Sequence, residues 1–279
     1  MTELAYAPSS APVALLERAR HPIDRPAPVP LRRPTVSVII PALNEARNLP
    51  HVLGRLPEGI DEVILVDGRS TDDTVAVARR LRPDVRVVEQ TRKGKGNALA
   101  CGFDAATGDI IVMIDADGST DPAEIPRFVD ALVAGSDFAK GSRFISGGGS
   151  DDITPVRRLG NWFLNALVNV AYRTRYTDLC YGYNAFWRHC LDEIRLDAGD
   201  VTEDRAMQWG DGFEIETIIN VRVARVGLSI AEVPSFEQPR LHGDSNLSAV
   251  RDGLRVLRCI VTERFAPRRV QSPSYAEAR

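Results

Sequence analysis

The chain of 279 residues carries 35 basic and 38 acidic side chains, for a formal net charge of −3, and 44% of its residues are hydrophobic. This balance is typical of a globular protein and argues against a dedicated nucleic-acid binder, which would carry a basic surplus. The sequence shows no apolar run of the ~18–20 residues that a transmembrane helix needs, no secretory signal pattern and no metal-like spacing of its four cysteines. We therefore expect a cytoplasmic protein with reduced thiols, and peripheral contact with the inner face of a membrane stays open.

Residues 1–33 are rich in Pro, Ala and Arg, and they predict a disordered N-terminal tail. After them, short apolar runs alternate with helical patterns. Strands are predicted at residues 36–40, 62–66, 85–89 and 109–114, and helices at 46–56, from 70–73 to 81, and at 97–106. This alternation predicts an α/β fold with a mostly parallel central sheet flanked by helices.

The second half of the chain continues with mixed elements. Asp121 is expected to cap a helix that ends near residue 134, followed by a strand at 137–140 and a Gly- and Ser-rich loop at 145–152. Further helices are predicted at 156–173, 211–225 and 247–265, a strand at 228–233, and a flexible tail at 266–279. The apolar stripes of the first and last of these helices, which include Trp162, Phe163, Leu254 and Val261, are expected to face the core, with a membrane surface as the alternative.

Two carboxylates, Asp115 and Asp117, end the apolar run at residues 110–114. Side chains two residues apart in an extended chain point the same way, so this pair should emerge together where parallel sheets bind ligands. Adjacent like charges favour a hard divalent cation between them. An ordinary Asp-Gly turn is the alternative interpretation.

Other polar residues fall on the same predicted edge of the sheet. Asn44, Glu45 and Asp67 follow the first two strands, and Lys93, Lys95 and Arg143 supply positive charge for phosphate groups. The loop around Lys95 has neither the spacing of a Walker A motif nor that of a dinucleotide-binding loop, which disfavours a P-loop kinase and an oxidoreductase.

Four motifs in this order resemble those of the family 2 glycosyltransferases: Val38–Glu45, Val66–Asp72, Lys95–Ala98 and Asp115–Gly118. Within that family the chain is most similar to the dolichol-phosphate mannosyltransferase-like (polyprenyl-phosphate glycosyltransferase) branch, across about residues 36–260. Gly141–Phe144, Thr177–Asp178, Gly212–Glu216 and Arg240–Ser245 extend the match. The resemblance implies a GT-A-type fold, with a nucleotide-sugar-binding half at 34–145 and an acceptor-binding half of the same domain at 146–265.

The resemblance also implies a reaction. A metal-dependent inverting glycosyltransferase would move a sugar from a UDP- or GDP-linked donor to a polyprenyl phosphate or a soluble acceptor. It would hold Mg²⁺ or Mn²⁺ at Asp115 and Asp117. Relatives often have a metal-binding Gln where this chain has Ser119, so the identity of a third protein ligand stays open. Donor-binding roles are implied for Pro41, Asn44, Glu45, Asp67, Lys95, Asp115, Ala116 and Asp117, and a phosphate-facing role for Arg143.

On the acceptor side, Asp178, Glu214 and Glu216 are candidates for acid–base chemistry, which a hydroxyl acceptor would need and a phosphate would not. Ordinary ion pairs are the alternative for all three. Arg240 and Ser245 are expected to hold the acceptor or to close over the donor, unless they belong to a solvated loop. The alternative functions are those of a sugar-nucleotide nucleotidyltransferase and of a non-catalytic sugar-nucleotide binder. The first would carry a Gly-rich basic loop where this chain has Pro41–Glu45. The oligomeric state stays open.

Overall fold

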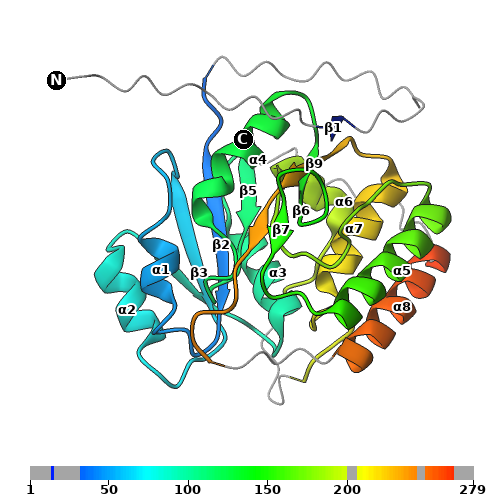
Figure 1. Ribbon diagram of the computed structural model, residues 1–279. Helices are drawn as coiled ribbons and strands as arrows, with labels where there is room; N and C mark the ends of the chain where they lie inside the picture. The colour runs from blue at the N-terminus through cyan, green and yellow to red at the C-terminus, as the bar shows by residue number, and fades with distance from the viewer. Residues whose placement is uncertain (1–13, 16–31, 200–205, 244–248, 267–279) are drawn as a thin grey trace.

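The computed structural model describes residues 14–15, 32–199, 206–243 and 249–266 (Figure 1). Its centre is an eight-stranded sheet with the order β1-β9-β6-β8-β5-β2-β3-β4. The strands are β1 (Ala14–Leu15), β2 (Val36–Ala42), β3 (Glu62–Asp67), β4 (Arg86–Glu89), β5 (Ile110–Met113), β6 (Phe138–Ser142), β8 (Asn184–Trp187) and β9 (Ile230–Pro234). Two further strands, β7 (Gly149–Ser150) and β10 (Phe236–Glu237), pair with each other in parallel.

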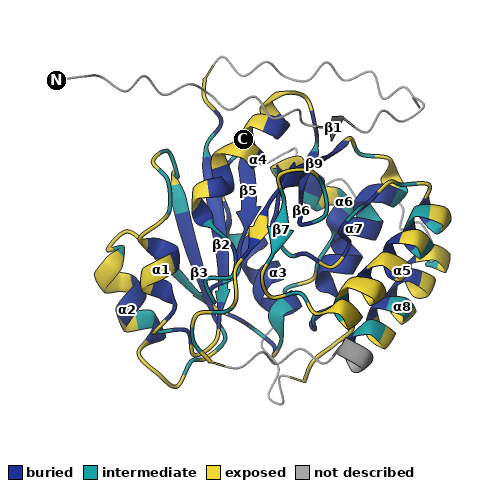
Figure 2. Ribbon diagram, viewed as in Figure 1, coloured by how far each residue is buried: buried dark blue, intermediate teal, exposed yellow. Residues whose placement is uncertain are grey.

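Helices cover both faces of this sheet, as predicted. They are α1 (Leu49–Leu53), α2 (Thr74–Leu81), α3 (Lys95–Ala105), α4 (Ile125–Val133), α5 (Pro155–Tyr172), α6 (Leu191–Ile194), α7 (Ile215–Val226) and α8 (Ala249–Phe265). Because neighbouring residues of a strand face opposite ways, Ile39 belongs to the core cluster that includes residues of α3, α5, α7 and α8, whereas Val38 and Ile40 belong to the one that includes residues of α1, α2 and α4. Figure 2 shows central strands such as β2 and β5 as largely buried.

The parallel strands β5, β2, β3 and β4 bring several loops to one edge of the sheet. Met113 is level with Ile39, and Asp67 is level with Ala42. The residues that follow β2, β3 and β5 therefore meet at the same edge. The fold-class prediction is confirmed, and so is the cap of the 3-10 turn before α4, where the Asp121 carboxylate accepts a hydrogen bond from Ala123 N.

The sequence did not predict β8. This strand runs antiparallel to both β5 and β6, between which it lies, and its four residues are too short a run to separate from a turn. It places two strand spacings, roughly 10 Å, between the ends of β5 and β6. The helix expected at 46–56 is also shorter, and the one expected at 97–106 begins two residues earlier, at Lys95.

The expected core-facing orientation of the apolar stripes on α5 and α8 is confirmed only in part, because Leu164 and Val168 are buried but other members of the stripes are not. Trp162 is 66% exposed and Phe163 54% exposed, while Leu254 and Val261 of α8 also face outward. The buried residues of α5 include Asn161, Leu164, Asn165 and Val168, and those of α8 include Val256, Cys259 and Ile260.

Amide side chains explain why α5 is turned this way. Asn165 donates to Thr177 O (2.5 Å) and accepts from Leu179 N (2.7 Å), and Asn169 donates to Tyr176 O (2.8 Å) and accepts from Tyr176 N (2.7 Å). Each amide satisfies backbone groups that would otherwise be buried without a partner. A hydrophobicity pattern cannot predict a helix that buries its Asn side.

No helix in the described part of the chain is long and apolar enough to cross a membrane. The predicted tails lie largely outside the described residues, although Ala14–Leu15 forms β1 beside β9.

Candidate active site

The carboxylates after β5 already carry basic partners. Lys95 Nζ lies 2.5 Å from Asp115 Oδ1, and an Nη of Arg240 lies 3.3 Å from Asp117 Oδ2. The two carboxylates remain 30% and 22% exposed. The repulsion expected for adjacent like charges is thus offset by two cations from other parts of the chain.

Lys95 connects three elements at this edge. It begins α3, and its Nζ also lies 2.7 Å from Glu216 Oε1 on α7. Burial by itself lowers the pKa of Lys95, but the carboxylates of Asp115 and Glu216 raise it above its ordinary value. The side chain stays a fixed positive charge throughout the pH range of the protein.

Glycines let the Lys95 loop approach residues 210–211. A Cβ on Gly96 would lie 1.8 Å from Gly210 O, and Gly96 N donates to Asp211 O at 2.8 Å. Gly94 has a φ of 113°, which favours glycine. Arg92 secures the same loop through a buried two-point pair with Asp211, at 2.8 and 3.0 Å.

The predicted donor-binding residues on the neighbouring strands lie on two loops that bond to each other. Asp67 accepts backbone hydrogen bonds from Arg69 and Ser70, and Asn44, with a φ of 59°, accepts one from Thr71 N at 2.7 Å. The buried Glu45 follows. Burial raises its pKa, against hydrogen bonds from Asn48 and Arg240 that lower it. Pro41, Asn44, Glu45 and Asp67 therefore share one ordered ledge beside the carboxylate pair.

Residues 238–243, which we call the strap, cross this ledge. Gln238 N donates to Ser119 O (2.8 Å) and Leu241 N to Asp117 O (3.4 Å). Arg240 also lies 2.5 Å from Glu45, so one guanidinium bridges the loop after β2 and the loop after β5. Ser245, which the sequence placed with Arg240, lies outside the described residues.

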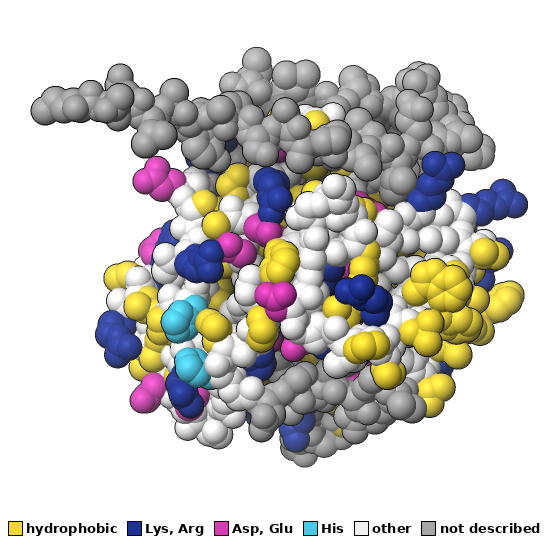
Figure 3. All heavy atoms as spheres, viewed as in Figure 1, with side chains coloured by type: hydrophobic (Ala, Val, Ile, Leu, Met, Phe, Trp, Pro, Cys, Tyr) yellow, Lys and Arg dark blue, Asp and Glu magenta, His cyan; other side chains and the backbone are white. Residues whose placement is uncertain are grey.

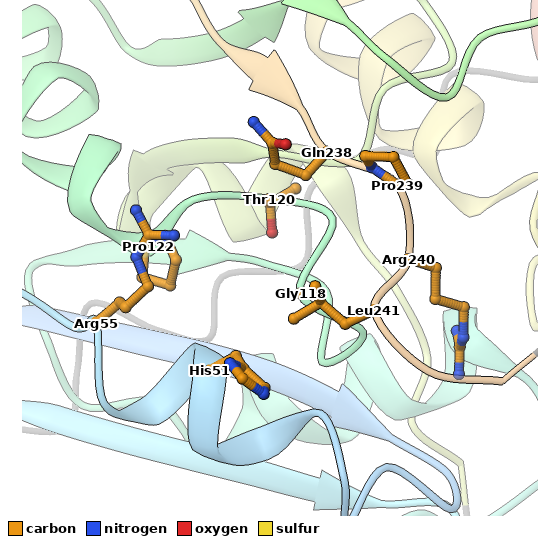
Figure 4. A pocket seen from close by; sticks show the side chains of 9 residues that line it. All are labelled: His51, Arg55, Gly118, Thr120, Pro122, Gln238, Pro239, Arg240 and Leu241. Atoms are coloured by element: carbon orange, nitrogen blue, oxygen red, sulfur yellow. The ribbon is translucent and has the colours of Figure 1, made fainter.

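A pocket of about 380 Å³ opens between the strap, α1 and the loop after β5 (Figure 4). The Thr120 hydroxyl is buried and has no hydrogen-bond partner among the described residues. The same is true of the Asn48 Oδ1 atom. Such atoms mark places where water or a ligand completes the hydrogen bonding. The lining residues are His51, Arg55, Gly118, Thr120, Pro122, Gln238, Pro239, Arg240 and Leu241.

The donor set fits a divalent metal bound together with a diphosphate. The described residues contain no group of three or more His, Cys, Asp or Glu side chains placed to enclose a metal. Asp115 and Asp117 would supply oxygen ligands, since Mg²⁺ is commonly held by one or two carboxylates together with substrate phosphates and water. A metal held here would therefore take its remaining ligands from the substrate and water.

Arg143 is placed apart from the carboxylate pair. Its guanidinium bonds both oxygens of Asp178, at 2.7 and 2.8 Å, and Glu237 at 2.9 Å, and it lies over the Tyr181 ring at 4.8 Å. The Asp178 side chain is fully buried. Burial lowers the pKa of Arg143, and the two carboxylates raise it above its ordinary value. The sequence missed Glu237, which is 94 residues from Arg143 and has no local signal.

This geometry does not offer Asp178 as a free base, because Arg143 occupies its carboxylate. Glu214 is buried just before α7, and its Oε2 atom has no hydrogen-bond partner among the described residues. Glu216 faces Lys95 instead of an open acceptor site. Catalytic roles for Asp178, Glu214 and Arg143 stay predictions.

A mostly parallel sheet with an acidic pair, a fixed lysine and a loop ledge at one edge defines a GT-A-type nucleotide-sugar transferase. A model of the family described as "Glycosyl transferase family 2" matches residues 37–195, and the chain belongs to this family. It is a glycosyltransferase, and the predicted metal-dependent, inverting transfer from a nucleotide diphosphate sugar fits this family.

Similar proteins support the assignment. A polyprenol monophosphomannose synthase of Mycolicibacterium smegmatis is 35% identical, over 83% of this chain and 88% of that protein. An undecaprenyl-phosphate mannosyltransferase of Micrococcus luteus is 35% identical, over 76% and 87%. The structure of glucosyl-3-phosphoglycerate synthase from Mycobacterium tuberculosis with Mn²⁺, UDP and phosphoglyceric acid superposes with a TM-score of 0.63 and 25% identity, over 84% and 80%.

Proposed function

We propose that the chain transfers a hexosyl group from a nucleotide diphosphate sugar to a polyprenyl phosphate at the inner face of a membrane. The observation that carries the acceptor class is the 35% identity to the polyprenol relative, which extends over 83% of this chain. A soluble phosphorylated acceptor is the second candidate, because a structural neighbour was solved with phosphoglyceric acid.

In this proposal, Asp115 and Asp117 hold Mg²⁺ or Mn²⁺ against the donor diphosphate. When bound, the metal offsets negative charge on the leaving group. Lys95 adds a fixed positive charge beside Asp115, and Arg240 lies within reach of the same edge. Pro41, Asn44, Glu45, Asp67 and Ala116 line the donor side.

The reaction is a single displacement at the anomeric carbon. A phosphate oxygen of the acceptor forms the new C–O bond, and the bond to the diphosphate breaks with its electron pair leaving on that group. A phosphate is already an anion, so the step needs no protein base. The occupied carboxylate of Asp178 is consistent with such an acceptor.

Donor and metal are tested by thermal shift with UDP- and GDP-linked sugars, each with Mn²⁺, Mg²⁺ or EDTA. We expect one nucleotide to stabilise the protein only when metal is present. An Asp117→Asn variant should lose the metal-dependent stabilisation by the nucleotide, while its melting temperature without ligand stays close to the wild-type value. If no nucleotide stabilises the wild type, the proposed donor site is wrong.

The acceptor is tested with a radiolabelled donor and two acceptors in parallel, a polyprenyl phosphate in detergent and phosphoglyceric acid in water. Label that moves to the organic phase supports the proposal. Label that is transferred only to the soluble acid refutes it in favour of the second candidate.

A further inference from the structure

One side of the molecule exposes large apolar side chains on two adjacent helices. On α5, Val156 and Leu159 are 70% and 66% exposed, next to Trp162 and Phe163. On α8, Leu254, Val261 and Phe265 are exposed as well. Tyr172 of α5 donates to Ile260 O of α8 at 2.7 Å, so the two helices are packed together, and Figure 3 shows the hydrophobic patch on their side of the molecule.

The orientation of α5 is fixed by its polar side. Asn161, Asn165 and Asn169 are spaced four residues apart, and they bond the backbone of residues 176–180. Turning Trp162 and Phe163 inward would leave these amides and the backbone groups unpaired. The apolar face is therefore a stable outer surface, larger than the single exposed residues normal for a monomer.

The charges around this face are mostly positive; the exposed acids Asp151 and Asp152 lie just before α5, and Asp152 pairs with Arg157 at 2.7 Å. From Ile153 to Thr177 the sequence has four Arg, at 157, 158, 173 and 175, and no Asp or Glu. The acidic residues of α8 whose side chains are described, Asp252 and Glu263, are each 5% exposed. In contrast, Arg255, Arg258 and Arg264 are exposed.

This pattern favours a membrane over a second copy of the chain. A two-fold contact through this face would bring the same arginines of two copies together, and the exposed acids next to α5 are Asp151 and Asp152, of which Asp152 is already paired with Arg157. Aromatic and aliphatic side chains flanked by arginine suit the boundary between anionic headgroups and acyl chains. Neither helix is able to span the bilayer, so the face would lie on it.

The helix is also joined to the candidate acceptor side. α5 begins twelve residues after Arg143 and ends six residues before Asp178, the two members of the buried pair. A membrane held against α5 would bring a lipid phosphate to the half of the sheet edge that carries this pair.

We propose that the exposed face of α5 and α8, centred on Trp162 and Phe163, docks the protein onto an anionic membrane. The inference rests on the proposed lipid acceptor for its biological purpose, but the docking is measurable without any transfer reaction.

The test is co-sedimentation of the full chain with vesicles of phosphatidylcholine, with and without phosphatidylglycerol. We expect binding that requires the anionic lipid and weakens with salt. Trp162→Ser with Phe163→Ser should weaken it at least tenfold, and Arg157→Gln with Arg158→Gln should weaken it on anionic vesicles. The matched control is Leu81→Ser with Val133→Ser, two exposed apolar residues on other helices, 42% and 54% exposed, which should bind like the wild type.

Unchanged vesicle binding of the Trp162/Phe163 variant would overturn the proposal, as would a wild-type dimer that this variant converts to monomer. Transfer to a short polyprenyl phosphate in detergent separates the two hypotheses. If the variant keeps this transfer but loses transfer to acceptor in vesicles, docking is supported. If the wild type binds vesicles but glycosylates no polyprenyl phosphate, the proposed function fails and the docking surface stands.

Discussion

Arg240 gives the sharpest prediction, because its guanidinium occupies the acidic site that we propose for the metal. In Arg240→Gln the strap keeps a hydrogen-bonding side chain but loses its charge. The contact between Arg240 and Asp117 is 3.3 Å long, and the two side chains are 26% and 22% exposed. The interaction free energy of such a partly exposed ion pair is about 0.5–1 kcal/mol. Removing this competing interaction should make Mn²⁺ alone bind about twofold to fivefold more tightly.

The same substitution should act in the opposite direction on the nucleotide. Once the diphosphate and metal are bound, a released Arg240 would donate to phosphate oxygens, and a hydrogen bond to a charged group contributes about 1.5–3 kcal/mol. Binding of the nucleoside diphosphate in the presence of Mn²⁺ should therefore weaken by about 10-fold to 100-fold. A role confined to holding the strap in place would not produce this change of sign.

Mn²⁺ binding is measured by loss of the free-ion signal in electron paramagnetic resonance, and nucleotide binding by calorimetry. Arg55→Gln is the matched control, since Arg55 lines the same pocket but pairs with Asp121 at 2.6 Å. Mn²⁺ affinity that is unchanged or lower in Arg240→Gln would refute the competition between guanidinium and metal.

Three further predictions concern stability. Gly96→Ala should lower the free energy of unfolding by about 1–3 kcal/mol, because it forces a Cβ against Gly210 O. Gly160→Ala on α5, where a Cβ meets open space, should not lower it. Urea unfolding of both variants checks this, and equal losses would contradict it. Arg92→Met should cost about 3–5 kcal/mol in the same measurement, because Asp211 would stay buried without its cation, and a loss below about 1 kcal/mol would argue against the pair. Burial lowers the pKa of Lys140 from 10.5 to about 8, so between these values the unfolded chain holds a proton that the folded chain has released, and this group makes stability rise with pH. Relative to Lys140→Met, the wild type should gain about 2 kcal/mol between about pH 7.5 and about pH 9.5, and a pH-independent difference would show that the lysine stays charged.

The nucleotide half of the fold could be predicted because its signals are local. Each parallel strand is a short β-branched run that ends in a turn, and the residues after it reach a known edge of the sheet. That is why Asn44, Asp67 and Asp115 were placed together correctly. The order of these motifs along the chain indicated the family 2 glycosyltransferases.

The second half was less predictable because its organisation depends on contacts distant in sequence. Asp178 was a candidate for acid–base chemistry with an ordinary ion pair as the alternative, and the structure joins it to Arg143 and, through Arg143, to Glu237, 94 residues from Arg143. The direction of α5 depends on Asn165 and Asn169, whose role emerges only when residues 176–179 are in place. Hydrophobic periodicity assumes that the apolar side of a helix is buried. In α5 the side that carries the Asn residues is buried instead, because their amides bond backbone groups.

Lys95 and Arg240, the two cations beside the carboxylate pair, are held differently. This difference decides which of them is displaced when a metal binds. Lys95 starts a helix whose loop packs backbone against backbone at Gly96, and Glu216 keeps a second carboxylate on its ammonium group. Arg240 is on a strap that is held to the ledge by few hydrogen bonds, and its side chain is more exposed than that of Lys95, 26% against 16%. Displacing Lys95 would leave Glu216 buried without its cation. Moving Arg240 takes its charge from Glu45 as well, but Glu45 keeps the hydrogen bond from Asn48, and Asp117 becomes ready for metal. Metal entry should therefore follow movement of the strap, and protease cleavage within 238–243 should change when Mn²⁺ and nucleotide are added together; a cleavage rate that is indifferent to both would argue that Lys95 is the group displaced.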